Sequence, residues 1–235
     1  MAKNASSKKE EAIQLEKLDL QAGAPEAAAP SKLAGMRHRA FGVFKLLLGI
    51  ALLPLVYAQT VAFLEQFWRI DPRFQEIFWE GIITFLVVYL FIWEPAGIYR
   101  KGHHLLELFF GFLKPMVKVA PFLLPMYTII LTLLYLALSL KYKSESLLNY
   151  FVFLFGFSWL LHLVFSAKTV RGKEGDFVKG NYVFMFSFIY IVNISLLAIL
   201  FNLLFVEFSL VGFFNNSLQI TKQIFSSTFT QLFSA

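Results

Sequence analysis

Five long apolar segments follow one another along the chain, separated by short polar or basic stretches. They span residues 44–67, 77–93, 119–140, 150–167 and 182–208. Each reaches or approaches the about 20 residues that a helix needs to cross the hydrocarbon core of a bilayer. Since no strand-like alternation suits a barrel, backbone hydrogen bonding in lipid requires helices. The pattern predicts an all-α polytopic membrane protein with about five transmembrane helices, the first kinked at Pro54.

The stretch 96–113 is short and polar for a span that faces lipid. Pro95 can begin a helix there and Lys114-Pro115 can end it, but the segment carries Arg100, Lys101 and two histidines. We therefore expect a re-entrant or short sixth helix packed against the other helices. If this segment crossed the membrane completely, the chain would have six spans and every later segment would have the opposite orientation.

The two ends of the chain differ in character from its centre, which gives three expected parts. Residues 1–36 are charged and rich in alanine and proline, a composition typical of a disordered tail. Residues 37–208 form the transmembrane helical domain. In 209–235, apolar residues recur at helical spacing opposite Asn, Gln and Lys222, which favours an amphipathic helix at the membrane interface. A docking helix for another subunit is the alternative.

Composition and charge agree with a membrane protein. Hydrophobic residues make up 58% of the chain and charged residues 15%, below the about 25% usual in soluble domains. The net charge of +6 does not indicate nucleic-acid binding, because the basic residues lie between apolar runs. A cytoplasmic N-terminus would place on that side all but five of the 21 Lys and Arg residues, namely all except Arg69, Arg73, Lys141, Lys143 and Lys222. The first span should then act as an uncleaved anchor.

The absence of cysteine excludes disulfides and thiolate metal sites, so candidate chemistry rests on other polar residues. Three of the spans carry polar side chains at helical spacing, and we expect these stripes to point inward, where they can pair between helices. The stripes comprise Thr128, Thr132, Tyr135 and Ser139; Ser158, His162 and Ser166; and Ser187, Tyr190, Asn193 and Asn202. His162 is either a packing histidine or a metal ligand.

A polar island at 102–107 is the strongest candidate site. His103 and Glu107 lie four residues apart, so one face of a helix would carry both, and both side chains can bind zinc. The alternative is a basic cluster, formed by the histidines with Arg100 and Lys101, that attracts anionic lipid head groups.

The surroundings of this island resemble the site-2-protease-like intramembrane metallopeptidases. The run 98–111 is similar to their Gly-His-Glu-x-x-His helix, and 120–128 is similar to the Ala-Pro-x-x-x-Pro-x-Tyr-Thr opening of the next span in bacterial members. Segments 158–165, 175–177 and 188–193 also resemble their later spans. The resemblance implies a bacterial inner-membrane location and a zinc site.

The chain departs from this family motif at the residues that bind zinc and activate water. His103 matches the first zinc ligand, but His104 stands where the family has its general base, and Glu107 stands where it has its second histidine. The third ligand motif is absent, so His162 or Asp176 would have to substitute for it. The polar, Gly-rich stretch that helps to seat substrate shrinks to 112–119.

These departures favour a non-catalytic relative that acts as a scaffold or partner-binding subunit. Its partners would be the lipid bilayer and other membrane subunits or a partner transmembrane helix, with no nucleic acid and no resident cofactor. The first alternative is an active zinc-dependent intramembrane metallopeptidase, with zinc on His103, Glu107 and His162 and water activated by His104 or by a carboxylate elsewhere in the chain. The second is a small transporter or lipid-handling protein whose polar stripes line a path.

Overall fold

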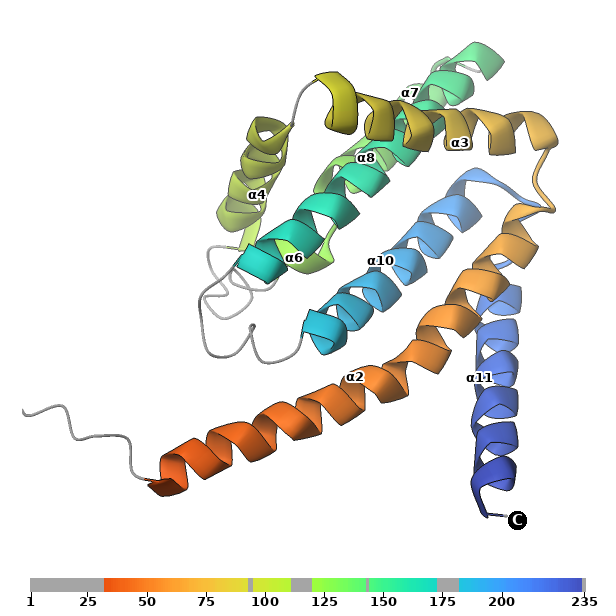
Figure 1. Cartoon of the computed structure of the whole chain (residues 1–235). Helices are drawn as coiled ribbons and strands as arrows, with labels where there is room; N and C mark the ends of the chain where they lie inside the picture. Colours follow the sequence, from red (N-terminus) through yellow and green to blue (C-terminus); the bar gives the residue numbers. More distant parts are fainter. Residues whose placement is uncertain (1–31, 93–94, 111–119, 143, 173–181, 234–235) are drawn as a thin grey trace, which may run out of the picture. The chain divides into compact units, whose positions relative to one another are not determined.

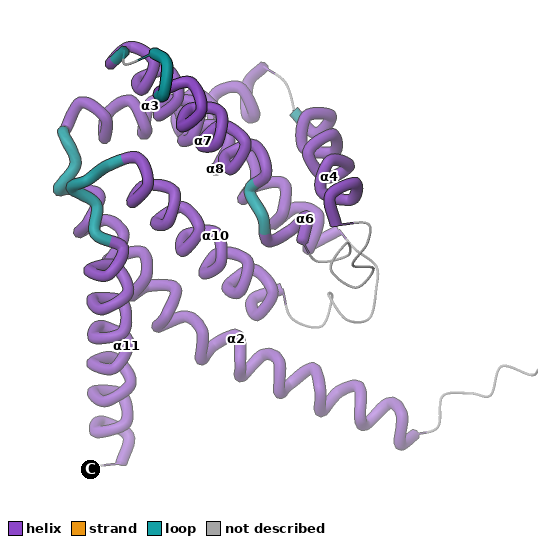
Figure 2. Tube along the Cα trace, turned by 180° about the vertical axis from the view of Figure 1, so that it is seen from behind, coloured by secondary structure: helices purple, strands orange, loops and turns teal. Residues whose placement is uncertain are grey.

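The structure is a computed structural model that describes residues 32–92, 95–110, 120–142, 144–172 and 182–233. These residues form helices joined by short connections, and no strand occurs among them (Figures 1 and 2). The expected all-α polytopic membrane fold is confirmed. The helices are α2 (Lys32–Phe67), α3 (Pro72–Val87) with its π-helical continuation η1 (Val88–Ile92), α4 (Ala96–Phe110), α6 (Ala120–Leu123), α7 (Met126–Ser139), α8 (Glu145–Gly172), α10 (Tyr182–Leu204) and α11 (Leu210–Phe233).

The chain divides into two compact units, Met1–Val43 and Phe44–Ala235. In the first unit, the described part is the beginning of α2 from Lys32 onward. Residues 32–36, expected to belong to a disordered tail, are therefore helical, and the rest of that tail lies outside the described residues. The second unit contains all the other helices.

Four helices are long and apolar enough to cross a membrane: Ala40–Phe67, Pro72–Ile92, Glu145–Arg171 and Tyr182–Leu204. They correspond to four of the five predicted spans. Pro54 lies within α2 without ending it. The second span begins earlier than predicted because Asp71 accepts a hydrogen bond from the Arg73 amide and Pro72 occupies the first turn, where proline is tolerated.

The third predicted span, 119–140, is not one continuous helix. Its described part is divided into α6 and α7 at Leu124 and Pro125. Proline lacks an amide hydrogen and disfavours helical geometry at the preceding residue, which explains the break. With 14 residues, α7 is about 21 Å long, less than the about 30 Å of the hydrocarbon core.

Contacts between helices fix their directions within the second unit. Arg73 pairs with Glu145 and Tyr89 contacts Phe165, so α3 and α8 run the same way. On α7, Thr128 meets Ser158 and Tyr135 meets Phe151, so α7 runs opposite to α8. Successive contacts, from Gly49 with Phe184 to Phe63 with Phe201, show that α2 and α10 are parallel.

Helix α4 can connect α3 to α7 without crossing the membrane. Tyr99, near its start, stacks on Phe165 close to the end of α8, and the Ile98 carbonyl accepts a 2.6 Å hydrogen bond from the Tyr127 hydroxyl at the start of α7. Both neighbours lie at the end of the bundle where α3 finishes. The expectation of a short additional helix packed against the spans is confirmed.

The most extensive helix contact is between α3 and α8, and it depends on two glycines. A Cβ atom on Gly81 would lie 3.0 Å from the Phe153 carbonyl carbon and 3.1 Å from the Phe157 nitrogen, with the Phe153 oxygen closer still. A Cβ atom on Gly156 would meet the Ile82 nitrogen at 3.2 Å and the Phe78 carbonyl more closely. Small residues permit such close backbone approach in membrane helices, where packing rather than the hydrophobic effect holds helices together.

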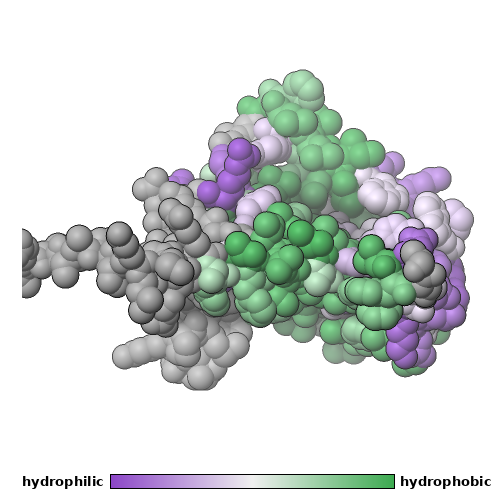
Figure 3. Space-filling model, turned by 60° about the horizontal axis from the view of Figure 1, so that its bottom comes forward, coloured by the Kyte–Doolittle hydropathy of each residue, from purple (hydrophilic) through white to green (hydrophobic). Residues whose placement is uncertain are grey.

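Phenylalanine fills the interior around this crossing. Phe78 and Phe201 meet edge to face with ring centroids 5.2 Å apart, and Phe63 meets Phe201 similarly at 5.6 Å. Large apolar side chains are also exposed along the spans, as expected of helices that face acyl chains. On the face drawn in Figure 3, hydrophobic side chains form a broad surface over the described helices. The chain is an integral membrane protein.

The two ends of this bundle differ in charge. Where α3 and α8 finish and α7 begins, the described charged side chains include Arg100, Lys101, Lys168 and Arg171. The opposite end carries Arg69, Arg73 and Lys141 together with Glu65, Asp71, Glu145 and Glu207. In the part of the chain that the structure describes, the first end is thus basic, whereas the second carries both signs.

Candidate functional site

Residues of the predicted polar stripes form hydrogen bonds between helices, either with another stripe or with Thr60 of α2. The Thr128 hydroxyl on α7 and the Ser158 hydroxyl on α8 are 2.9 Å apart, and both residues are buried. Thr60 on α2 and Tyr190 on α10 form a second hydroxyl pair at 2.9 Å. These contacts are the inter-helical hydrogen bonds expected of polar residues in a membrane bundle.

Other stripe residues bond to their own helix or serve a different role. The Thr132 hydroxyl donates to the Thr128 carbonyl and the Ser139 hydroxyl to the Leu136 carbonyl. Asn202 is exposed rather than directed inward, and its side-chain oxygen accepts a hydrogen bond from the Leu210 amide at the start of α11.

The break between α6 and α7 is the centre of a buried polar cluster. The Phe122 carbonyl accepts from His162 Nε2 on α8 at 3.2 Å, and the Leu123 carbonyl accepts from Asn193 Nδ2 on α10 at 3.2 Å. Irregular backbone within a bilayer is tolerated where it is buried in protein and its polar groups find partners. His162 and Asn193 supply such partners, which is a structural role for the two most unusual polar residues of the spans.

The surroundings of His162 continue this cluster toward α4. The Ser166 hydroxyl lies 3.3 Å from His162 Nε2 and 3.3 Å from the Tyr99 hydroxyl, and all three residues are buried. The Tyr99 and His162 ring centroids are 6.1 Å apart. Because a carbonyl oxygen only accepts, the hydrogen bond to Phe122 requires that His162 Nε2 carry the proton.

The predicted metal ligands are only partly within the described structure. The backbone of α4 carries His103 and Glu107 one turn apart, but their side chains lie outside the described part, as does Asp176. His104, the candidate base, is exposed. Among the described residues, no three His, Asp or Glu side chains are grouped closely enough to hold a metal ion.

The Phe122 carbonyl engages Nε2 of His162, so a metal at this residue would bind the other ring nitrogen, Nδ1. Among the described side chains of α4, Tyr99 contacts His162, although it is not part of the predicted metal motif. The signal for it was present, since Tyr99 precedes His103 by one helical turn and therefore shares its face.

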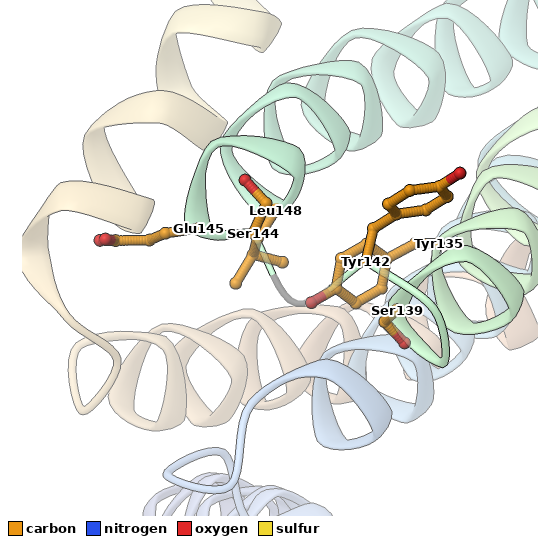
Figure 4. A pocket seen from close by; sticks show the side chains of 6 residues that line it. All are labelled: Tyr135, Ser139, Tyr142, Ser144, Glu145 and Leu148. Carbon is orange, nitrogen blue, oxygen red and sulfur yellow. The ribbon is translucent and has the colours of Figure 1, made fainter.

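A pocket of about 230 Å³ lies at the turn between α7 and α8, apart from this cluster. Figure 4 shows Glu145 pointing away from the two tyrosine rings, and its carboxylate forms an exposed ion pair with Arg73 on α3. The Ser139 hydroxyl donates a hydrogen bond to the Leu136 carbonyl of its own helix. The lining groups do not converge on one point, so the pocket suggests no specific ligand. Its lining residues are Tyr135, Ser139, Tyr142, Ser144, Glu145 and Leu148.

Glycine allows the close approach of α4 to α7. A Cβ atom on Gly102 would lie 2.6 Å from a ring carbon of Tyr127, so the tyrosine ring packs directly on the α4 backbone. This contact lies beside the polar island and holds it next to the start of α7.

Comparison with known proteins gives no relative for the chain: no family model, no curated protein and no solved structure matches it.

Proposed function

We propose that the chain is a non-catalytic integral membrane protein, similar in design to the site-2-protease-like family, that acts as a scaffold or partner-binding subunit. The observation that carries this proposal is the hydrogen bond from His162 Nε2 to the Phe122 carbonyl. It gives His162 a role that needs no metal, namely support of the break between α6 and α7. The replacement of the family's general base by His104 supports the same conclusion.

Helix α2 is the best candidate for the partner-binding surface. In its most apolar stretch 11% of the residues are buried, compared with 44% for α8. Leu47 and Leu53 are 61% and 46% exposed, whereas Ala58 and Ala62 face the other helices. The uncovered side of α2 would accept a transmembrane helix of another subunit, since dispersion contacts between side chains drive such association in lipid.

Photo-crosslinking in native membranes tests this surface. A photoreactive residue at Leu47 or Leu53 should give a discrete higher-mass product that contains a second membrane protein. The same residue at Ala62, which is buried, should give internal crosslinks only. Products that contain lipid alone at both exposed positions would refute partner binding through α2.

Metal analysis tests the non-catalytic assignment. We expect detergent-purified full-length protein to contain less than one zinc per chain, and His103→Ala and His162→Ala to leave that content unchanged. His38→Ala serves as a control because His38 lies outside the motif. One zinc per chain that is lost in both motif variants would refute the proposal and favour the metallopeptidase.

The active metallopeptidase is the alternative because α4 and α8 lie side by side at the motif. Tyr99, one turn before His103, packs on the His162 ring. While Nε2 of His162 donates to the Phe122 carbonyl, its Nδ1 could bind a metal held by His103 and Glu107. Cleavage of a membrane-embedded peptide by the purified protein, abolished by a chelator, would establish this alternative.

The charge asymmetry supports an orientation with the N-terminus in the cytoplasm, and the family resemblance supports the bacterial inner membrane. Basic residues are favoured on the cytoplasmic side of a membrane. The basic end of the bundle is the end at which α7 begins, and α2 finishes at the opposite end, so the first span would start on the cytoplasmic side. A topology reporter fused after Ala235 should then be active outside the cytoplasm. Cytoplasmic activity of that reporter would reverse the orientation.

A further inference from the structure

The beginning of α11 is capped by Ser209 and fastened to α2 and α10 by the side chains of Gln66 and Asn202. The Ser209 hydroxyl accepts from the Gly212 amide at 3.0 Å, and the Asn202 side chain accepts from the Leu210 amide at 3.1 Å. The Gln66 side chain accepts from the Ser209 amide at 3.3 Å. These bonds satisfy amides that a helix leaves unpaired at its start, and they fix α11 where α2 and α10 finish.

Beyond this point, the side chains of α11 divide into three faces. The face toward the bundle carries buried Phe213 and Ser217 and half-buried Ile220 and Ile224. A second face is apolar but exposed, with Phe229 65% and Leu232 69% exposed. We refer to it as the outer stripe; it consists of Val211, Phe214, Leu218, Phe225, Phe229 and Leu232. The third face is polar and consists of Asn215, Gln219, Gln223, Ser226 and Thr230.

The order of these faces around the helix is informative. At 100° per residue, only Thr221 and Thr228 separate the outer stripe from the bundle face, so the two form one largely apolar arc with the polar face opposite. Lys222 falls at the border between the outer stripe and the polar face, where a long basic side chain can reach toward head groups. This arrangement is that of a helix lying at a lipid–water boundary.

We propose that α11 lies in the plane of the membrane, in the leaflet at the end of the bundle where α2 and α10 finish, with its outer stripe inserted among the upper acyl chains. Its 24 residues would extend about 36 Å along that leaflet. The occupant of the outer stripe is thus lipid. The order of the faces argues for lipid over a second helix, since an apolar arc opposite a polar face and bordered by Lys222 suits acyl chains on one side and water on the other.

Site-directed spin labelling provides a direct test, because the chain has no cysteine and each introduced cysteine is unique. Full-length protein in phosphatidylethanolamine–phosphatidylglycerol nanodiscs would carry one label at a time. Leu218→Cys, Phe225→Cys and Phe229→Cys sample the outer stripe; Gln219→Cys, Gln223→Cys and Thr230→Cys sample the polar face. Leu133→Cys, on an exposed part of α7, gives the reference for acyl chains.

We expect labels on the outer stripe to collide with oxygen and to be shielded from a water-soluble nickel chelate, and labels on the polar face to show the reverse. The depth of the outer-stripe labels should be similar at Leu218 and Phe229. Shielding of the outer stripe from both reagents would overturn the proposal in favour of a protein partner or a second copy. A depth that increases steadily from Leu218 to Phe229 would overturn it in favour of an inserted helix, and nickel access to the outer stripe would mean that it faces water.

Discussion

Replacing Gly81 or Gly156 with alanine tests how closely α3 and α8 approach. At either position the new Cβ atom would meet backbone atoms of the other helix at 3.2 Å or less, where ordinary contact begins at 3.4 Å. The obstacles are backbone atoms, which cannot rotate away as a side chain can. Relief therefore requires the two helices to separate by on the order of 1 Å along their whole crossing, which weakens the dispersion contacts around it.

The expected cost follows from two opposing effects. Overpacking a tight contact costs about 1–3 kcal/mol, whereas alanine gains about 0.8–1 kcal/mol of helix propensity over glycine. The difference of the two effects is about 0–2 kcal/mol, and because the obstacles are backbone atoms we expect each variant to lower the free energy of unfolding by the upper half of that range, about 1–2 kcal/mol. The double variant should cost less than the sum of the two, because one separation of the helices makes room for both methyl groups.

Unfolding by SDS in mixed micelles, followed by tryptophan fluorescence, measures these differences. Trp159 lies on α8 with its ring centroid 6.4 Å from that of Phe78, so its emission reports on this crossing. Gly97→Ala is the matched control, since a Cβ atom there meets nothing within 4 Å, and this variant should be as stable as the parent or more so. Equal stability of Gly81→Ala, Gly156→Ala and the control would refute the close crossing.

Three further predictions use the same unfolding measurement. His162→Ala should lower the free energy of unfolding by about 1–3 kcal/mol, because the buried Phe122 carbonyl loses a donor; an unchanged stability would show that the bond has no structural role. Tyr190→Phe should lower the free energy of unfolding by only about 0.6 kcal/mol. Removing the hydroxyl of its partner Thr60 as well should lower it little further, because the hydrogen bond is already lost; additive losses would argue against the pair. Arg73→Ala should cost less than about 1 kcal/mol because its ion pair with Glu145 is exposed, and a larger loss would mean that the pair anchors α3 to α8.

Hydrophobic length was sufficient to predict most of the fold. A run of about 20 apolar residues has few structural options in lipid, so four spans and the helical nature of 210–233 followed from the sequence. The prediction of the third span as one continuous helix was wrong. It considered only hydrophobicity, whereas Pro125 disfavours helical geometry at Leu124. The polar stripes were predicted as residues, but their partners were not.

Pairing between helices depends on direction and rotation, which a single sequence specifies weakly. His162 was predicted to be a packing histidine or a metal ligand and Asn193 to be part of a polar stripe, yet nothing in their spacing indicated that they would support the carbonyls of Phe122 and Leu123. Gln66 was missed altogether, although a fully buried amide near the end of a span has few roles other than binding backbone. The proposed metal site remains a prediction, since it depends on the side chains of His103 and Glu107.

The broken helix constrains how the protein enters the membrane during synthesis. The carbonyls of Phe122 and Leu123 receive their donors from α8 and α10, which the ribosome makes later. Unpaired carbonyls in hydrocarbon cost several kcal/mol each, and α7 alone is too short to span the core. The nascent segment should therefore stay in contact with the insertion machinery or a chaperone until the chain has been made as far as Asn193, so that release into lipid is a concerted, late event.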